Sequence, residues 1–298
     1  MNNLNAWVRF LGLTALVSVG ATAWSQPSST LAKIATSGVV VVAHSDSTFP
    51  FSYLDAKKQV RGYSIDICTR IVEALASELK KPLTTQYVVA TGAKRMEAIV
   101  SGQADLECGS STNTPQRREH VAFALSHYVA GARLLIPSNL NATKVDEMEG
   151  KKIATSKGTT ASKVLRERIA ERLLRIEHVE AESSPKAFDM LMSGQVDGFF
   201  NDDVLLSARR ARSSDPKAWK IVDKTYTVEP MGIMFRRNDP GMKQVVDRVL
   251  KKMMASGELQ KLYDAWFVQL VPGETQALEL PMNALTRDYF RRPVELSF

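Results

Sequence analysis

One ten-residue pattern occurs twice in this chain, and it constrains the fold more than any other feature. Residues 96–105 (MEAIVSGQAD) return as residues 188–197 (FDMLMSGQVD). Each copy predicts the last turns of a helix, a glycine that ends the helix in the left-handed conformation, and a strand. Helix–glycine–strand connections are common, so coincidence is the alternative. Because Ser-Gly-Gln-x-Asp stands in an equivalent setting both times, we favour two lobes of similar build.

The first part of the chain alternates strands and helices. Residues 39–43 (VVVVA) form a β-branched run that predicts a buried strand, and further strands are expected at 84–89 and 104–108. An amphipathic helix that ends at about Lys80 and a short helix at 95–100 separate them. Such alternation is typical of βαβ units. We therefore expect an α/β fold in which each lobe is a mostly parallel sheet flanked by helices.

A polar cluster follows the strand of each repeat copy. Residues 109–113 (GSSTN) come after the first strand, and residues 201–203 (NDD) come after the second. In open α/β sheets, ligands bind beyond the carboxyl ends of the strands. The two clusters therefore predict a ligand site to which both lobes contribute.

Two extended, apolar-rich segments, 129–137 and 226–235, predict the crossovers between the lobes. On this division, residues 26–135 and 228–298 form the first lobe. Residues 136–227 form the second lobe, which is an insertion in the first.

Residues 1–25 have the three-part layout of a secretory signal. They begin with one Arg and no acid, continue with an apolar run at 10–20, and end in small residues that suit cleavage after Ala23 or Ser25. The run is about half of the roughly 20 apolar residues that span a bilayer, and no cysteine follows it to be lipidated. We expect a cleaved leader and a soluble, non-lipidated periplasmic protein.

The net charge of +7 does not indicate a nucleic-acid partner. Basic residues occur as scattered doublets with acids between them, and none forms a run of five or six. Export from the cell also argues against nucleic-acid binding. A solvated basic surface explains the charge better.

The chain has two cysteines, Cys68 and Cys108, which allow only one pairing. In an oxidising compartment disulfides persist, so we favour a disulfide. Two buried free thiols are the alternative, because a free cysteine behaves as a small apolar residue.

The standard catalytic and cofactor motifs are missing from the sequence. It contains no phosphate-binding Gly-x-x-x-x-Gly-Lys loop, no Gly-x-Gly-x-x-Gly, no His-Glu-x-x-His and no Gly-x-Ser-x-Gly. Its four histidines also lack the spacing of metal ligands. We therefore expect no catalytic residue, no metal and no cofactor.

Three polar groups suit the capture of a zwitterion. Residues 110–112 and Arg117 offer hydroxyl groups and a guanidinium, which grips a carboxylate through paired hydrogen bonds. Residues 156–160 (SKGTT) precede a helical stretch, and a helix N-terminus favours anions. Asp202 ends the repeat strand of the second lobe and could meet an ammonium group. Buried ligand charges are costly unless each is paired, so a molecule that carries both charges would hold the lobes together.

Several of these segments resemble the family 3 bacterial solute-binding proteins, the periplasmic amino-acid receptors of ABC importers. Residues 62–67 (GYSIDI) and the helix after them resemble the signature of that family. The likeness spans nearly the whole mature chain, and it is greatest to the glutamate/aspartate-binding members. Other matching segments are 50–53 (PFSY), 107–110 (ECGS), 158–160 (GTT), 202–206 (DDVLL), 256–258 (SGE) and 266–267 (WF).

The resemblance implies a type 2 periplasmic binding fold, in which two lobes joined by a two-strand hinge close on a ligand. It implies that Arg117 holds the α-carboxylate, that Asp202 holds the α-ammonium, that Phe51 packs on the ligand, and that Arg95 faces an acidic side chain. It also implies an ABC permease as partner and a monomeric receptor without enzymatic activity. The implied ligand-binding residues are Phe51, Arg95, Ser110, Thr112, Arg117, Thr159, Thr160 and Asp202.

Three positions depart from the acidic-ligand pattern. Ser45, Gly92 and Ser184 stand where those members have an Arg, a Ser and a His. Arg95 is therefore expected to be the main partner of a side-chain carboxylate. A periplasmic dehydratase similar to cyclohexadienyl dehydratase and a receptor's sensor domain are the alternatives that the resemblance leaves open. The sequence contains no membrane-spanning or signalling segment after Phe267 that would favour the sensor domain.

Overall fold

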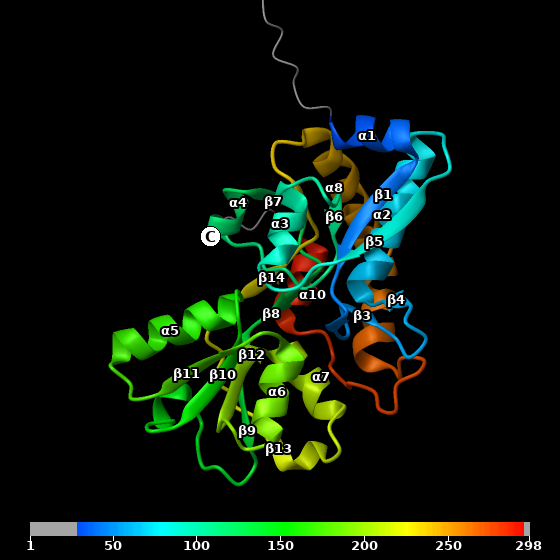
Figure 1. Cartoon of the computed structure of the whole chain (residues 1–298). Helices are drawn as coiled ribbons and strands as arrows, with labels where there is room; N and C mark the ends of the chain where they lie inside the picture. Colours follow the sequence, from blue (N-terminus) through cyan, green and yellow to red (C-terminus); the bar gives the residue numbers. More distant parts are fainter. Residues whose placement is uncertain (1–28, 295–298) are drawn as a thin grey trace, which may run out of the picture.

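Two five-stranded sheets organise the computed structural model, which describes residues 29–294 (Figure 1). The leader expected at residues 1–25 lies outside the described residues. In Figure 1 the first sheet and its helices form one lobe, and the second sheet with α5, α6 and α7 forms the other. The expected α/β architecture with two lobes is confirmed.

The first sheet has the strand order β5-β1-β6-β15-β7. Strand β1 pairs in parallel with β5 and β6, whereas β15 runs antiparallel to β6 and β7. The strands are β1 (Val39–His44), β5 (Thr84–Val89), β6 (Leu106–Glu107), β7 (Val121–Phe123) and β15 (Met234–Arg236).

The second sheet has the same plan, with the strand order β11-β10-β12-β9-β13. Strand β10 pairs in parallel with β11 and β12, and β9 runs antiparallel to β12 and β13. Both sheets are therefore mostly parallel, with one reversed strand in the fourth position. The strands are β9 (Ala132–Pro137), β10 (Lys152–Ser156), β11 (Glu177–Ala181), β12 (Gly198–Asp202) and β13 (Trp219–Ile221).

A two-stranded antiparallel ribbon connects the lobes. It consists of β8 (Tyr128–Ala130) and β14 (Glu229–Met231). Each strand leads directly into the reversed strand of a sheet, β8 into β9 and β14 into β15. The boundary expected at residue 135 falls inside β9. Because β9 pairs only with strands of the second sheet, we place that boundary between Ala130 and Ala132 instead.

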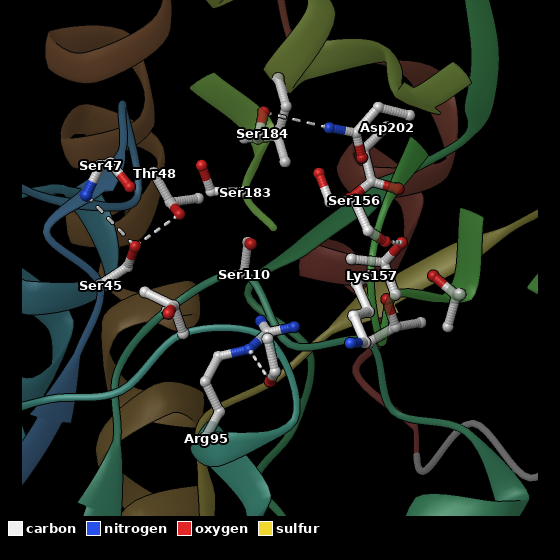
Figure 2. Close-up of a pocket in the computed structure, with 18 of the residues that line it drawn as sticks. Ser45, Ser47, Thr48, Arg95, Ser110, Ser156, Lys157, Ser183, Ser184 and Asp202 are labelled. Atoms are coloured by element: carbon white, nitrogen blue, oxygen red, sulfur yellow. Dashed lines mark hydrogen bonds between the residues drawn. The ribbon is translucent and has the colours of Figure 1, made fainter. Parts of the chain in front are cut away.

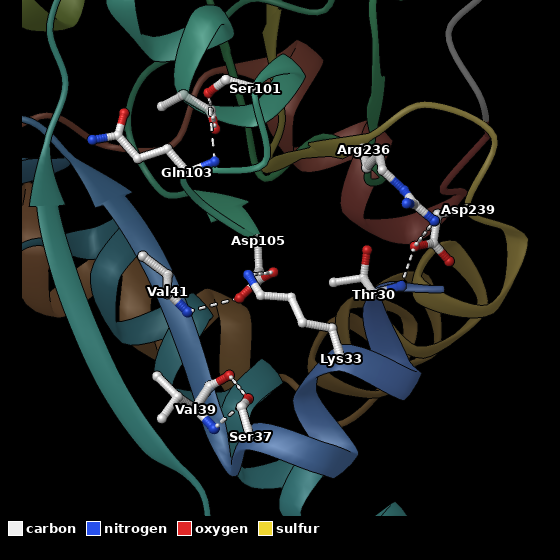
Figure 3. Close-up of polar contacts among 11 residues, drawn as sticks. Thr30, Lys33, Ser37, Val39, Val41, Ser101, Gln103, Asp105, Arg236 and Asp239 are labelled. Atoms are coloured by element: carbon white, nitrogen blue, oxygen red, sulfur yellow. Dashed lines mark hydrogen bonds and ion pairs between the residues drawn. The ribbon is translucent and has the colours of Figure 1, made fainter. Parts of the chain in front are cut away.

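The repeated motif has the same structural role in both lobes, and Figure 3 shows its copy in the first lobe. Asp105 accepts a hydrogen bond from the backbone N–H of Val41 in β1 and pairs with Lys33 at 2.8 Å. Asp197 accepts from the N–H of Lys152 in β10 and pairs with Lys151 at 3.3 Å. The aspartate thus joins the start of β6 to β1 in the first lobe and the start of β12 to β10 in the second. This matching role supports similarity of build over coincidence.

Helices cover both sheets, and the repeat glycines Gly102 and Gly194 end α3 and α6 with φ of +76° and +70°. Within residues 29–294, no helix combines the length and apolarity that crossing a bilayer requires. The remaining elements are α1 (Thr30–Ser37), α2 (Tyr63–Glu78), α3 (Lys94–Val100), α4 (Pro115–Arg118), α5 (Thr160–Arg172), α6 (Ser184–Met192), α7 (Asp203–Ala211), α8 (Pro240–Ala255), α9 (Glu258–Tyr263), α10 (Ala284–Arg291), the short turns η1 (Val145–Glu147), η2 (Pro216–Ala218) and η3 (Asp264–Val268), and the small strands β2 (Ser47–Thr48), β3 (Ser52–Leu54) and β4 (Val60–Arg61).

A disulfide joins α2 to the residue that follows β6. Cys68 and Cys108 form this bond, with their Cα atoms 6.4 Å apart. Both cysteines are buried in the core that α2 and α8 build on the first sheet. The disulfide therefore anchors the polar segment that begins at Gly109 to a packed helix.

Candidate functional site

A pocket lies between the two lobes, where the carboxyl ends of both sheets face each other (Figure 2). Its volume is about 70 Å³, which is well below the roughly 300–1,000 Å³ of pockets for drug-sized ligands. The pocket therefore suits a small solute. The first lobe contributes the segments after β1, β5 and β6, and the second lobe contributes those after β10, β11 and β12.

The segment after β6 supplies the wall of the first lobe. Ser110 and Thr112 line the pocket, and Thr112 bridges to Met231 of the hinge ribbon. Arg117 lies on α4, where its Nη1 donates to the carbonyl oxygen of Thr112 at 2.9 Å. Burial and the neighbouring Arg95 lower the pKa of Arg117 to about 10. At neutral pH this guanidinium is still charged, so it is available to an anion.

Arg95 reaches the same pocket from α3. Its Nε donates to the carbonyl oxygen of Gly92 at 3.1 Å, and its Nη1 donates to the hydroxyl of Ser111 at 2.9 Å. These two bonds hold the guanidinium in place beside the pocket. The described residues thus bring two arginines to one small cavity, as the sequence predicts.

The N-terminus of α5 forms part of the opposite wall. Thr159 is the N-cap, since its hydroxyl accepts from the N–H of Ser162 at 3.2 Å, and Thr160 begins the helix. Both residues line the pocket. Ser156, at the end of β10, has a buried hydroxyl without a hydrogen-bond partner among residues 29–294. A helix N-terminus with free hydroxyl groups favours a carboxylate.

Asp202 ends β12 and brings a carboxylate into the pocket from the second lobe. Its Oδ1 is buried, and no hydrogen-bond partner is found for it in the described part of the chain. Burial, followed by Glu229 and Asp203, raises the pKa of Asp202 well above its usual value, and Arg95 and Arg117 oppose that shift. A buried carboxylate oxygen without a partner is costly, so an ammonium group placed against it would be favourable.

The expectation that Phe51 packs on the ligand is not supported by its position. Phe51 is fully buried and does not line the pocket. It lies in an aromatic cluster, where its ring centroid is 5.2 Å from that of Tyr128 and 5.5 Å from that of Phe267. The large apolar surface of the ring is better removed from water in this cluster. The expectation came from the family resemblance alone.

The three positions that depart from the acidic-ligand pattern do line the pocket. They are Ser45, Gly92 and Ser184. The Ser45 and Thr48 hydroxyl groups lie 2.7 Å apart, and Asn201 donates to the Ser184 hydroxyl at 3.4 Å. These positions therefore bring hydroxyl groups to the pocket, and Arg95, whose Nε donates to the Gly92 carbonyl oxygen, is a cation beside one of them.

Four further hydroxyl residues line the pocket and were not predicted. They follow strands β1, β5 and β11, so the rule that ligands bind beyond the carboxyl ends of strands could have found them. The residues are Ser47, Thr48, Thr91 and Ser183.

The pocket offers charge pairing and hydrogen bonding. Among residues 29–294, no group of three or more His, Cys, Asp or Glu side chains is arranged to hold a metal ion. For an anion the pocket offers the α5 N-terminus and the cations Arg95, Arg117 and Lys157. For a cation it offers the carboxylates of Asp202 and Glu182, and hydroxyl groups surround both sets.

Curated proteins of similar sequence are named as solute-binding proteins. The chain is 32% identical over 294 residues to the "Glutamate/aspartate import solute-binding protein" of Salmonella typhimurium, which covers 98% of this chain and 97% of that protein. It is 33% identical over 268 residues to the "L-glutamate/L-aspartate-binding protein" of Pseudomonas aeruginosa, with 89% of each chain covered.

Solved structures of similar fold include other binding proteins. A mutant of ArgBP from T. maritima superposes with a TM-score of 0.72 at 21% identity, over 80% of this chain and 99% of that one. An ancestral amino acid-binding protein, described as a precursor of cyclohexadienyl dehydratase, has a TM-score of 0.67 at 27% identity, over 80% of this chain and 99% of that one.

The sequence model of one family matches residues 40–269, which include both sheets and the pocket between them. Its description is bacterial extracellular solute-binding proteins, family 3. The near full-length relatives agree with that assignment. This chain belongs to the family 3 bacterial extracellular solute-binding proteins.

Proposed function

We propose that this protein is the periplasmic receptor of an amino-acid ABC importer and that it binds L-glutamate or L-aspartate between its lobes. The observation that carries the proposal is the meeting of Arg117 from the first lobe and Asp202 from the second in one small pocket. The names of the relatives from Salmonella typhimurium and Pseudomonas aeruginosa support the choice of ligand.

The two charged groups of the amino acid would be bound by different lobes. Arg117, with Thr112 and the α5 N-terminus around Thr160, holds the α-carboxylate. Asp202, with Ser110, holds the α-ammonium. Because each lobe supplies only part of this set, the ligand stabilises the closed arrangement over the open one by its differential contacts. The protein changes no covalent bond of the ligand.

Arg95 is proposed to bind the side-chain carboxylate. It is the second guanidinium in the pocket, and its bonds to Gly92 and Ser111 fix its direction. The hydroxyl groups of Ser45, Thr48 and Ser184 would complete this end of the site. We further propose a cleaved, non-lipidated leader at residues 1–25, a monomeric receptor, and a membrane permease as its partner.

The test is calorimetric titration of ligand-free protein with each of the twenty amino acids. We expect L-glutamate or L-aspartate to bind most tightly, with Arg95→Ala relaxing the side-chain preference. If no amino acid binds, the transport function is wrong.

A dehydratase is the second candidate, because the ancestral neighbour is a precursor of such an enzyme. The substrate of cyclohexadienyl dehydratase, prephenate, lacks an α-ammonium group, so it would leave Asp202 buried without a partner. Incubation with prephenate and detection of phenylpyruvate separates the two functions. We expect no product.

A further inference from the structure

Lys157 is a cation of the second lobe that lines the pocket and that the ligand contacts proposed above do not use. It follows β10 and comes two residues before Thr159, the N-cap of α5. Its side chain is 66% exposed, so it lies at the rim of the pocket. Figure 2 shows its amino group directed toward the part of the pocket where the guanidinium of Arg95 lies.

The two lobes touch each other beside Lys157. A Cβ atom built on Gly92 of the first lobe would lie 3.4 Å from the Lys157 carbonyl oxygen. A Cβ atom built on Gly158 of the second lobe would lie 3.3 Å from the backbone nitrogen of Ala93. Arg95 is tied to the same place, because its Nε donates to the carbonyl oxygen of Gly92 at 3.1 Å. One contact between the lobes therefore has Arg95 on its first-lobe side and Lys157 on its second-lobe side.

The ion pair that Lys157 makes within its own lobe is loose. Its Nζ lies 3.9 Å from Oε1 of Glu182, a distance too long for a hydrogen bond. The Glu182 side chain is 85% exposed. Exposed ion pairs of this kind contribute little free energy. Lys157 can therefore exchange Glu182 for a carboxylate in the pocket at small cost.

The charges around the pocket match those of an acidic amino acid. Among residues 29–294, three cations and two acids line it, which gives a formal excess of one positive charge; they are Arg95, Arg117, Lys157, Asp202 and Glu182. A zwitterion with a neutral side chain has no net charge, whereas glutamate and aspartate are net negative. If Arg117 and Asp202 bind the α-groups, Arg95 and Lys157 remain for the second carboxylate.

We propose that Lys157 is a specificity-determining residue, whose ammonium group binds the side-chain carboxylate of the ligand from the second lobe while Arg95 binds it from the first. On binding, Lys157 exchanges Glu182 for that carboxylate. Because the two cations belong to different lobes, they meet one carboxylate only when the lobes are closed. An acidic side chain therefore stabilises closure more than its amide does. The inference rests on the proposed function and names a second-lobe residue that sets the preference for an acidic ligand.

The test is Lys157→Gln, which removes the positive charge and keeps a polar side chain. Calorimetric titration compares L-glutamate with L-glutamine, which differ in having a carboxylate or an amide at the end of the side chain. The affinity for L-glutamate should fall at least about tenfold, since a hydrogen bond between charged groups is lost, while that for L-glutamine should stay within about twofold. Lys157→Arg, which keeps the charge, should keep the preference for L-glutamate.

The control is Lys163→Gln, which makes the same change in net charge nearby. Lys163 is an exposed residue of α5 that does not line the pocket, and it pairs with Glu167 at 3.7 Å. Both affinities should be unchanged in this variant. An equal loss of L-glutamate affinity in Lys163→Gln and Lys157→Gln would overturn the proposal, because only the net charge near the pocket would then matter.

Glu182→Gln tests the exchange of partners. Removal of this competing acid should strengthen L-glutamate binding about twofold to fourfold in the wild-type background, and it should have no effect in the Lys157→Gln background. An equal gain in both backgrounds would contradict the exchange, because Glu182 would then act only by repelling the ligand.

An unchanged ratio between the L-glutamate and L-glutamine affinities in Lys157→Gln would also overturn the proposal. In that case, wild-type binding of L-glutamate would still support the proposed function, so the two failures differ. If the wild type binds no amino acid, the proposed function is wrong and the role of Lys157 is wrong with it.

Discussion

Arg117 and Asp202 approach the same pocket from different lobes, where Asp202 is buried and Arg117 is partly buried. Burial disfavours the charged form of both groups, as the lowered pKa of Arg117 and the raised pKa of Asp202 show. Each comes after a strand of the repeat in the sequence, and both line the pocket. Phe51, which the family resemblance implies as a ligand contact, is instead fully buried and does not line the pocket.

Arg117→Ala and Asp202→Ala should each weaken amino-acid binding by more than about 30-fold. Removal of one partner of a buried charge pair costs about 2–5 kcal/mol, since the ligand charge is left unpaired. Calorimetric titration with L-glutamate measures the loss. Arg166→Ala, whose side chain is 61% exposed on α5, is the control and should bind normally. Binding within threefold of the wild type in either pocket variant would refute these roles.

His127 should make the fold sensitive to acid. It is fully buried, neither ring nitrogen has a hydrogen-bond partner within the described residues, and burial lowers its pKa to about 3. Between pH 6.5 and 3 the unfolded chain therefore binds a proton that the folded chain does not, so stability falls as pH falls. From pH 7 to 4.5 this should cost about 2–3 kcal/mol, at about 1.4 kcal/mol per pH unit.

Urea unfolding of the wild type and His127→Phe at several pH values measures that effect. The comparison concerns the slope of unfolding free energy against pH, which the variant should flatten between pH 4.5 and 6.5. Parallel slopes in the two proteins would show that His127 has no such role.

At the scale of elements, the repeat was the most informative pattern, because it predicted two lobes of similar build, and the two sheets do share one strand plan. Local patterns located β1, β5 and α2 because β-branched runs and apolar faces are strong signals. The strand expected at 104–108 is shorter, since only Leu106 and Glu107 pair within the sheet. The extended segments expected at 129–137 and 226–235 include β9 and most of β15. Their antiparallel pairing in the two sheets could not be predicted, because β9 and β15 pair with strands that are distant in sequence.

The repeat aspartates give a matched pair of stability predictions. Asp105→Ala should lower the free energy of unfolding by about 1–3 kcal/mol, because the Val41 N–H loses its buried acceptor. Asp197→Ala should cost less, since the Asp197 side chain is 35% exposed and that of Asp105 only 4%. Chemical denaturation of both variants tests the order. An equal or reversed order would contradict the claim that burial of the aspartate sets the cost of its removal.

At the scale of the molecule, two arginines at the C-terminal end of α7 in the second lobe also contact the first lobe. The Cζ atom of Arg212 lies 3.7 Å from the ring centroid of Phe49, and its Nε donates to Glu274 Oε2 at 2.7 Å. Arg209 donates to the carbonyl oxygen of Ser47 at 2.6 Å. These contacts exist only while the lobes are together, so they favour the closed arrangement.

Arg212→Ala should therefore weaken ligand binding threefold to tenfold without a change in ligand preference. Small-angle X-ray scattering should also show a larger radius of gyration in the ligand-free variant than in the wild type. The control is Arg210→Ala, because Arg210 also lies on α7 but its side chain makes none of the contacts described for Arg209 and Arg212. Loss of selectivity, or an unchanged affinity and radius, would contradict a role in closure.

Titration with L-glutamate and with two of its analogues tests the central idea most directly. Glutarate lacks the ammonium group, and 4-aminobutyrate lacks the α-carboxylate. Since Asp202 and Arg117 would each lose their ligand partner, both analogues should bind at least 100-fold more weakly than L-glutamate. Comparable binding of glutarate and L-glutamate would show that the two lobes do not close on opposite charges of one molecule.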